Sequence, residues 1–139
     1  MTDGPDVAPS PPIGVAGRTY PPVPFTIEPE RVAAFARAIG ADPTAGVPPT
    51  FAAVYALWAT APQLFGDADA AVDFAKLLHA EQEFEWERHP QLGETVVSQG
   101  KVASDASRRG IRLISFETET IGATGDLICR SHALFVIRS

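Results

Sequence analysis

The first regular element that the hydrophobic pattern predicts is a helix over residues 28–39. Its apolar positions recur at the spacing of one helix face, a proline lies near its start, and Gly40 follows as a stop signal. These apolar positions are Val32, Phe35, Ala36 and Ile39. Residues 41–49 contain three prolines and one glycine, so they are predicted to form a loop.

A second helix is predicted over residues 50–60, and its composition indicates that it lies inside the domain. None of these residues carries a charge, so no face of the helix favours water. We therefore expect the rest of the chain to enclose this helix on nearly all sides.

From residue 78 the pattern changes to an alternation of period two, which is typical of β-strands. In residues 78–86 it predicts a mostly apolar inner face and an acidic outer face that also carries His79. The predicted inner face consists of Leu78, Ala80, Gln82, Phe84 and Trp86. Further antiparallel strands are predicted over residues 95–104, 111–121 and 127–138.

This order of elements predicts one α+β domain in which a curved antiparallel sheet wraps around a central helix. A chain of 139 residues is long enough to bury one such core without disulfide bonds. Residues 1–16 contain four prolines among small residues and are expected to form a disordered tail. Residues 17–139 then form the domain.

Charge and composition argue against several classes of function. The net charge of −6 disfavours a nucleic-acid partner. No apolar run approaches the roughly 18 residues that span a bilayer, and the chain does not begin with a signal peptide, so we expect neither membrane insertion nor secretion. The single cysteine, Cys129, suits a reducing cytoplasm. No Cys/His cluster has metal-ligand spacing, and we expect no metal and no cofactor.

Three short stretches and a turn occur in a characteristic order along the chain. They are residues 17–22 (GRTYPP), 48–51 (PPTF), 78–86 (LHAEQEFEW) and the turn at 92–95 (LGET). Over residues 17–138 the chain resembles the N-terminal domains of MaoC-like acyl-thioester dehydratases. The resemblance implies a hot-dog fold that dimerises by joining sheet edges. It also implies acyl substrates that are carried on coenzyme A or on an acyl carrier protein.

The chain departs from this family in the loop that carries the catalytic residues. In active members that loop reads Gly-Asp, Asn-Pro and then His, and its carboxylate and imidazole perform general acid/base catalysis. Here residues 39–49 form a shorter loop with neither Asn-Pro nor histidine. Asp42 is the candidate remnant of the carboxylate, and no neighbouring side chain supplies an imidazole. We therefore expect no catalytic pair in this chain.

Thr50 and Phe51 occupy the start of the central helix, where the family binds the thioester carbonyl through a backbone N–H. Unpaired N–H groups and the positive end of a helix dipole suit a developing enolate oxygen. The alternative interpretation is that Thr50 simply caps the helix.

Other candidate substrate-binding residues lie on the central helix and the strand that follows it. Phe51, Val54, Tyr55 and Trp58 recur at the spacing of one helix face, which predicts either the lining of an acyl channel or ordinary core. Gln82 is predicted to be a buried amide that hydrogen-bonds to the helix end, a partner chain or the ligand.

Two further polar features have weaker functional interpretations. His79, beside Glu81, is predicted to be a solvated or interface side chain rather than a base. Arg108 and Arg109 precede Gly110 in a predicted hairpin turn. They could receive the phosphates of a pantetheine carrier, although a solvated turn is the simpler interpretation.

The leading functional hypothesis is a non-catalytic or substrate-shaping subunit of a heteromeric (R)-specific 3-hydroxyacyl-thioester dehydratase or enoyl-thioester hydratase. A partner hot-dog chain would contribute the Asp/His pair. One alternative is a self-sufficient hot-dog thioesterase that uses Asp42 or a strand glutamate. Another is an acyl-thioester binding module without catalysis. In each case an open sheet edge predicts a homo- or hetero-oligomer rather than a monomer.

Overall fold

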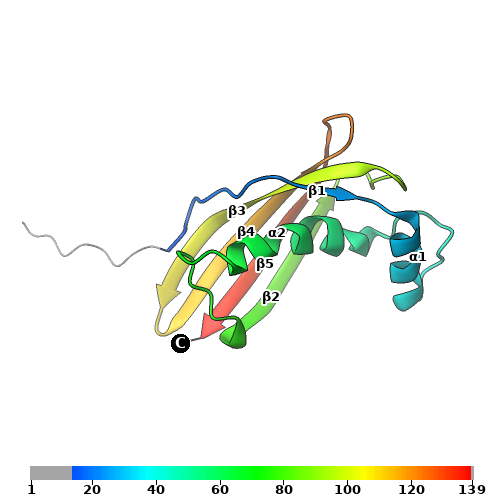
Figure 1. The fold of residues 1–139 in the computed structure, drawn as a ribbon. Helices are drawn as coiled ribbons and strands as arrows, with labels where there is room; N and C mark the ends of the chain where they lie inside the picture. The colour runs from blue at the N-terminus through cyan, green and yellow to red at the C-terminus, as the bar shows by residue number, and fades with distance from the viewer. Residues whose placement is uncertain (1–13, 139) are drawn as a thin grey trace, which may run out of the picture.

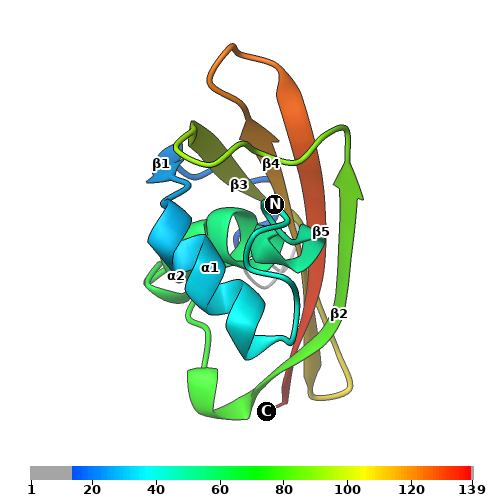
Figure 2. The same cartoon turned by 90° about the vertical axis from the view of Figure 1, so that its right-hand side faces the viewer.

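The computed structural model describes residues 14–138, which form a layer of sheet and a layer of helices (Figure 1 and Figure 2). The sheet is antiparallel, with the strand order β1-β3-β4-β5-β2. The strands are β1 (Val23–Thr26), β2 (Leu77–Trp86), β3 (Thr95–Arg108), β4 (Ile111–Ile121) and β5 (Leu127–Arg138). Because the helices lie on the concave face of this sheet, the predicted α+β fold with a sheet around a central helix is confirmed.

The first helix, α1 (Pro29–Ala38), lies where the sequence predicts it. Proline begins the helix, and just beyond its end Gly40 adopts a φ of +77°, a left-handed conformation that favours glycine. The side chains of Val32 and Ala36 lie on the inner face of this helix and are buried. Residues 41–48 then form no helix or strand, as the loop prediction requires.

The central helix is assembled from three pieces instead of the single α-helix expected over residues 50–60. A 3₁₀ turn (Pro49–Phe51) leads into a π-helical turn (Ala53–Leu57), which α2 (Trp58–Phe65) continues. A short 3₁₀ turn, η3 (Phe74–Lys76), connects it to β2. Within residues 14–138, no helix combines the length and the apolar character that crossing a bilayer requires.

Buried hydroxyl groups of the sheet attach this irregular helix to the concave face. The Ser98 hydroxyl donates a hydrogen bond of 2.9 Å to the carbonyl oxygen of Tyr55, within the π-helical turn. The Thr60 and Thr118 hydroxyls lie 3.0 Å apart, and Thr60 also donates to the Ala56 carbonyl. Since a buried backbone carbonyl without a partner is costly, these contacts stabilise a helix of irregular winding.

The core is divided into two apolar clusters along the central helix. The cluster beneath α2 combines side chains of the helix with those of β4 and β5, including Leu57, Leu64, Ile114, Phe116 and Phe135. The second cluster, beneath α1, includes Ile27, Val32, Phe51, Tyr55 and Ile128.

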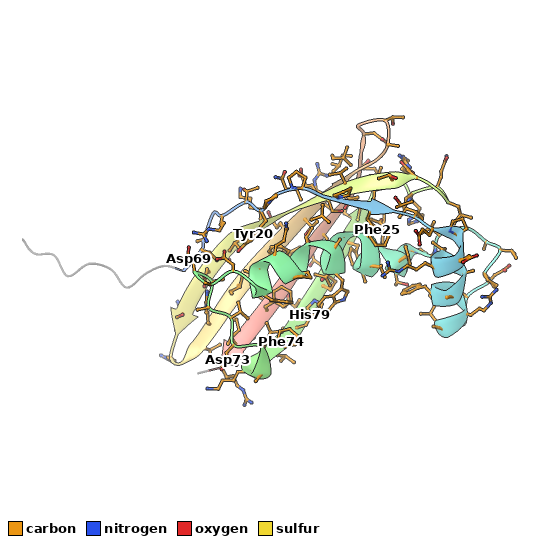
Figure 3. The ribbon with its side chains drawn as sticks, viewed as in Figure 1. Tyr20, Phe25, Asp69, Asp73, Phe74 and His79 are labelled. Carbon is orange, nitrogen blue, oxygen red and sulfur yellow. The ribbon has the colours of Figure 1, made fainter. Side chains whose placement is uncertain are left out.

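A β-bulge in β2 changes which of its side chains face inward. His79 pairs with Phe135, whereas Glu81 pairs with the next residue of β5, so Ala80 is the extra residue. The predicted alternation is therefore right after the bulge and wrong before it. Leu78 is 62% exposed. His79, which is labelled in Figure 3, lies against the buried Phe135 ring rather than on the acidic outer face.

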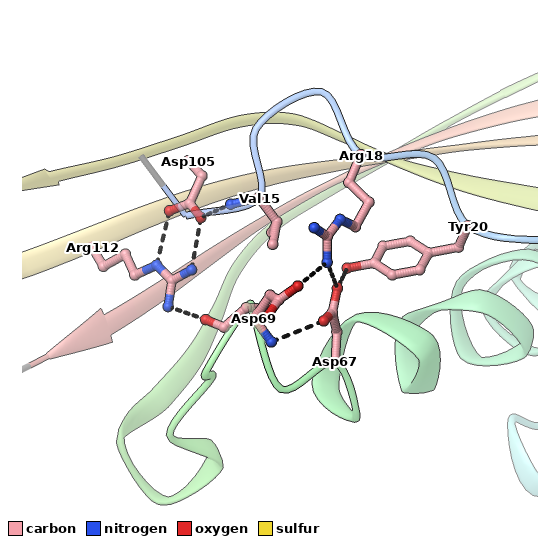
Figure 4. A network of polar contacts seen from close by, with 8 residues as sticks. Val15, Arg18, Tyr20, Asp67, Asp69, Asp105 and Arg112 are labelled. Carbon is pink, nitrogen blue, oxygen red and sulfur yellow. Dashed lines mark hydrogen bonds and ion pairs between the residues drawn. The ribbon is translucent and has the colours of Figure 1, made fainter. Parts of the chain in front are cut away.

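The segment before β1 belongs to the folded domain from at least residue 14. Val15 is buried, and its N–H donates a hydrogen bond of 3.0 Å to Asp105 on β3. Asp105 also forms a two-pronged ion pair with Arg112 on β4, at 2.8 and 2.7 Å (Figure 4). Residues 14–16 of the predicted tail (residues 1–16) therefore belong to the domain. Residues 1–13 lie outside the described residues.

A second polar contact joins the same segment to the loop that follows α2. Arg18 bridges the carboxylates of Asp67 and Asp69 at 2.8 and 3.1 Å. The Tyr20 hydroxyl donates to Asp67 at 2.7 Å. Together with the Asp105 pair, these bonds fix one extended segment across the end of the central helix (Figure 4).

Replacing Asp105 with asparagine is expected to lower the free energy of unfolding by about 3 kcal/mol near neutral pH, because Arg112 loses its buried counter-ion. Burial alone would raise the pKa of Asp105, but the Arg112 guanidinium and the Val15 N–H outweigh it and hold the pKa below its ordinary value. The stabilisation is therefore complete above the unfolded-state pKa of about 3.9 and is lost as pH falls through the folded-state pKa.

Urea unfolding of wild type and variant at neutral and acidic pH measures this difference, which should shrink in acid. Asp69→Asn is the matched control, because Asp69 is an exposed carboxylate in a surface ion pair and should matter far less. Equal losses from the two substitutions would contradict the prediction.

Candidate functional site

In the loop at residues 39–49, the side chain of Asp42 forms its hydrogen bonds within the loop itself. One oxygen of Asp42 accepts hydrogen bonds from the Thr44 hydroxyl at 2.7 Å and the Thr44 N–H at 2.8 Å. These two bonds hold the pKa of the Asp42 carboxyl below its ordinary value, which makes it a weaker base. Asp42 is exposed, and its loop contains no histidine.

The start of the central helix has fewer free N–H donors for a thioester carbonyl than the sequence predicts. Pro48, not Thr50, occupies the N-cap position, so the interpretation of Thr50 as the cap is wrong. The Phe51 N–H donates to the Pro48 carbonyl oxygen at 3.0 Å and is already used inside the turn. Of the two candidate residues, Phe51 is fully buried, and Thr50 is the one that is open to a ligand.

The stripe predicted from Phe51, Val54, Tyr55 and Trp58 is divided between two environments. The π-helical turn contains Val54 and Tyr55 and separates Phe51 from Trp58, so the spacing of an ordinary α-helix no longer places the four residues on one face. Phe51 and Tyr55 are completely buried, Val54 is partly buried, and Trp58 is 48% exposed. The central helix is therefore not enclosed on all sides, and Trp58 marks its open side.

Tyr55 does not open onto a channel or a seam. Its hydroxyl is buried and has no hydrogen-bond partner among the described residues, and the same holds for Nε1 of Trp86. Burial raises the pKa of Tyr55 far above its ordinary value. The hydroxyl is therefore a neutral group inside the cluster beneath α1.

Trp58 belongs to a row of rings that we call the aromatic surface, made up of Trp58, Phe65, Phe74, His79 and Phe135. Neighbouring ring centroids lie 5.2 to 6.3 Å apart, in a chain that runs from Trp58 through Phe65 and Phe135 to His79. Phe74, which is labelled in Figure 3, packs on Phe65 with their ring centroids 5.3 Å apart. It is 62% exposed. Trp58, Phe74 and His79 are the exposed members of this row, whereas Phe65 is partly buried and Phe135 is fully buried beneath them. Exposed apolar side chains that lie close together mark interaction surfaces.

Gln82 faces inward as predicted, but it bonds to the sheet rather than to the helix end. Its Nε2 donates to the Ser131 hydroxyl at 2.8 Å and to the Glu83 carbonyl at 3.2 Å. Its Oε1 lies 3.0 Å from Nε2 of His79. The amide thus connects the exposed imidazole of the aromatic surface to the buried Ser131 of β5.

β2 is a long open edge of the sheet. β5 pairs with one side of this strand, and no described strand pairs with the other. Its free N–H and C=O groups are therefore available to another strand. The outer face of β2 carries Glu81, Glu83 and Glu85, all of which are exposed.

Sequence reasoning misses two members of the aromatic surface. Phe65 follows Trp58 at the i, i+7 spacing of one helix face, but it lies beyond the predicted end of the helix, after Pro62. Phe74 lies in a short 3₁₀ turn with no periodic signal, so no pattern could have found it.

Two other features carry no assigned chemistry. A concavity of about 660 Å³ on the outer face of the sheet is lined by four glutamates, together with Arg130 and His132. Arg130 pairs there with Glu85 and Glu119 at 3.5 and 3.6 Å, as in a solvated ion-pair network. Arg109 is exposed and lies in the β3–β4 turn with a φ of +54°. This turn is at the end of the molecule opposite α1 (Figure 1).

The sheet order and the central helix on the concave face of the sheet define a hot-dog domain of the kind found in MaoC-like dehydratases. The family described as "FAS1-like, dehydratase domain region" matches residues 14–131. The chain belongs to this family.

Relatives and solved structures agree with this assignment. A UPF0336 protein of Leifsonia xyli subsp. xyli is 27% identical over 139 residues, a match that covers 88% of this chain and 92% of that protein. The fold resembles a chain of the truncated HadBC complex, a 3R-hydroxyacyl-ACP dehydratase of Mycobacterium tuberculosis, with a TM-score of 0.69 and 19% identity over 88% of this chain and 96% of that one. A chain of the ChsH1-ChsH2 complex of Mycobacterium tuberculosis gives a TM-score of 0.65 and 13% identity, with coverage of 87% and 89%.

Trp58→Ala is expected to cost less stability than Phe116→Ala. Phe116 is fully buried, and truncating a buried aromatic side chain typically costs about 3–5 kcal/mol. Trp58 is 48% exposed and already lacks packing on one side, so we expect a loss below about 2 kcal/mol. Urea unfolding of both variants provides the comparison, and equal losses would assign Trp58 to the sealed core.

Proposed function

We propose that this chain is the non-catalytic, substrate-shaping subunit of a heteromeric (R)-specific 3-hydroxyacyl-thioester dehydratase, which acts in reverse as an enoyl-thioester hydratase. Dehydration removes a proton from the carbon next to the thioester carbonyl and the hydroxyl from the following carbon, so it needs a base and an acid. The observation that carries the proposal is the state of the loop at residues 39–49. The one carboxylate of this loop, that of Asp42, accepts two hydrogen bonds from Thr44, and the loop contains no imidazole.

The open edge and the aromatic surface support a partner of the same fold. A second sheet that pairs along β2 would satisfy the free backbone groups of this strand. It would also bring apolar side chains over Trp58 and Phe74, which are too exposed for a finished core. Two solved structures of the same fold, HadBC and ChsH1-ChsH2, are themselves complexes.

In this proposal the acyl thioester lies in the seam between the two subunits. The partner supplies the carboxylate and the imidazole, and this chain supplies apolar surface for the acyl group. Coenzyme A and an acyl carrier protein are both suitable carriers. Of the predicted substrate-binding residues, Trp58, Gln82 and Thr50 are accessible to such a ligand, whereas Phe51 and Tyr55 support the fold from inside the core.

The purified chain alone is expected to show no hydratase activity on enoyl-CoA above background, and activity should appear when its hot-dog partner is added. The loss of absorbance of the conjugated enoyl thioester measures the rate. Co-purification from the native host followed by mass identification provides the partner. The isosteric variant Asp42→Asn should leave the activity of the assembled complex unchanged. Turnover by the chain alone that Asp42→Asn abolishes would sink the proposal and favour a self-sufficient enzyme.

Phe74→Asp is expected to weaken association at the β2 edge by at least about tenfold, because a charge would be buried in an aromatic contact. Its effect on the fold should be small, since Phe74 is 62% exposed. Sedimentation at micromolar concentration, with and without the partner, measures the association. Ile111→Asp is the matched control, because Ile111 is 43% exposed but lies on β4, away from the open edge. Equal weakening by both variants would argue against this seam.

A further inference from the structure

We infer that His79 is a substrate-binding residue that recognises the 3-hydroxyl group of the acyl chain through its free ring nitrogen, Nδ1. The inference rests on the proposed function, because it takes an acyl thioester in the β2 seam as the ligand. It goes further because it assigns one specific hydrogen bond to His79, a side chain that the sequence alternation predicts to lie in solvent. That hydrogen bond would give the complex a preference among acyl groups.

His79 faces the aromatic surface because of an irregularity in β2. The bulge at Ala80 turns this side chain from the acidic outer face of the sheet to the aromatic surface. Bulges of this kind are over-represented beside active sites, where they redirect a side chain. His79 remains exposed, so burial of its ring does not explain the bulge.

The contact with Gln82 determines which ring nitrogen of His79 carries the proton. The Gln82 amide nitrogen donates to Ser131 and to the Glu83 carbonyl, so its oxygen must be the atom that faces His79. An amide oxygen only accepts hydrogen bonds, and Nε2 of His79 is therefore the donor in the 3.0 Å contact. In the neutral imidazole this leaves Nδ1 as an acceptor. Nδ1 has no hydrogen bond to any described residue.

The imidazole of His79 is held in place by its neighbours. Gln82 is held at both ends of its amide, and Ser131 is buried on β5. The imidazole also rests against the ring of Phe135, which is fully buried. An acceptor held in this way loses little conformational freedom when a ligand binds, so a single hydrogen bond can discriminate between ligands.

The surroundings of His79 and the chemistry of the acyl group define the donor that Nδ1 would accept from. The aromatic surface around His79 suits hydrocarbon rather than a charged or strongly polar group. The thioester oxygen and sulfur are acceptors, and saturated and enoyl chains contain no donor. Within the acyl group of a hydration and dehydration pair, the 3-hydroxyl is the only group that can donate to Nδ1. His79 then favours the hydroxyacyl form over the saturated or enoyl form.

The test uses the assembled complex and two substitutions that separate the ring nitrogens. His79→Gln places an amide group near the Nε2 position and can keep the contact with Gln82, but it removes the acceptor at the δ position. His79→Asn places an oxygen near the Nδ1 position. We measure KM and kcat for (3R)-hydroxydecanoyl-CoA, together with the inhibition constant of decanoyl-CoA, which lacks the hydroxyl.

We expect His79→Gln to raise KM by about three- to tenfold, the value of one neutral hydrogen bond. Inhibition by decanoyl-CoA and kcat should stay as in the wild type, and His79→Asn should recover most of the lost KM. If His79→Gln leaves KM unchanged, or raises KM and the inhibition constant together, His79 has only a structural role. Equal loss with both variants also overturns the assignment to Nδ1. A complex with no turnover of any acyl thioester would instead refute the proposed function, and this inference with it.

Discussion

The structure depends on one constraint. The central helix is apolar on every side, and the one concave face of a single sheet must bury it. The five strands cover the helix from the side of β1 to that of β2, and the segment before β1 crosses its end. One side of the helix remains uncovered where β2 ends the sheet. The exposed Trp58 and the unpaired strand edge thus have a common origin, and in the proposed complex one partner sheet along β2 would cover both.

Two local irregularities decide what this uncovered side contains. The π-helical turn over Ala53–Leu57 separates Trp58 from the buried stripe, and the bulge at Ala80 brings His79 onto the inner face. Each departs from the regular winding or pairing of its element, and each needs local compensation. The Ser98 hydroxyl bonds to the backbone of the helix, and the Gln82 amide connects the two sides of the bulge. Irregular backbone of this kind is expected where function, rather than stability alone, shapes the chain.

Periodicity predicts most of the fold because most of the chain obeys it. The α1 helix follows its apolar face to the stop at Gly40, and the long strands follow their alternation. The site is less predictable because its two irregularities leave no trace in hydrophobicity. Residues 53–57 are all apolar, so a change of winding among them is invisible. Leu77 and Leu78 are adjacent, so either register of β2 places a leucine inward.

The charge on β2 has a consequence for self-recognition. If two copies of this chain joined through their β2 edges in antiparallel fashion, Glu81, Glu83 and Glu85 of each strand would lie beside those of the other on the same face. Like charges on neighbouring strands destabilise their pairing. A strand with basic or neutral residues at those positions incurs no such repulsion. In the proposed complex the glutamates would therefore favour a partner strand of different sequence over a second copy of this chain.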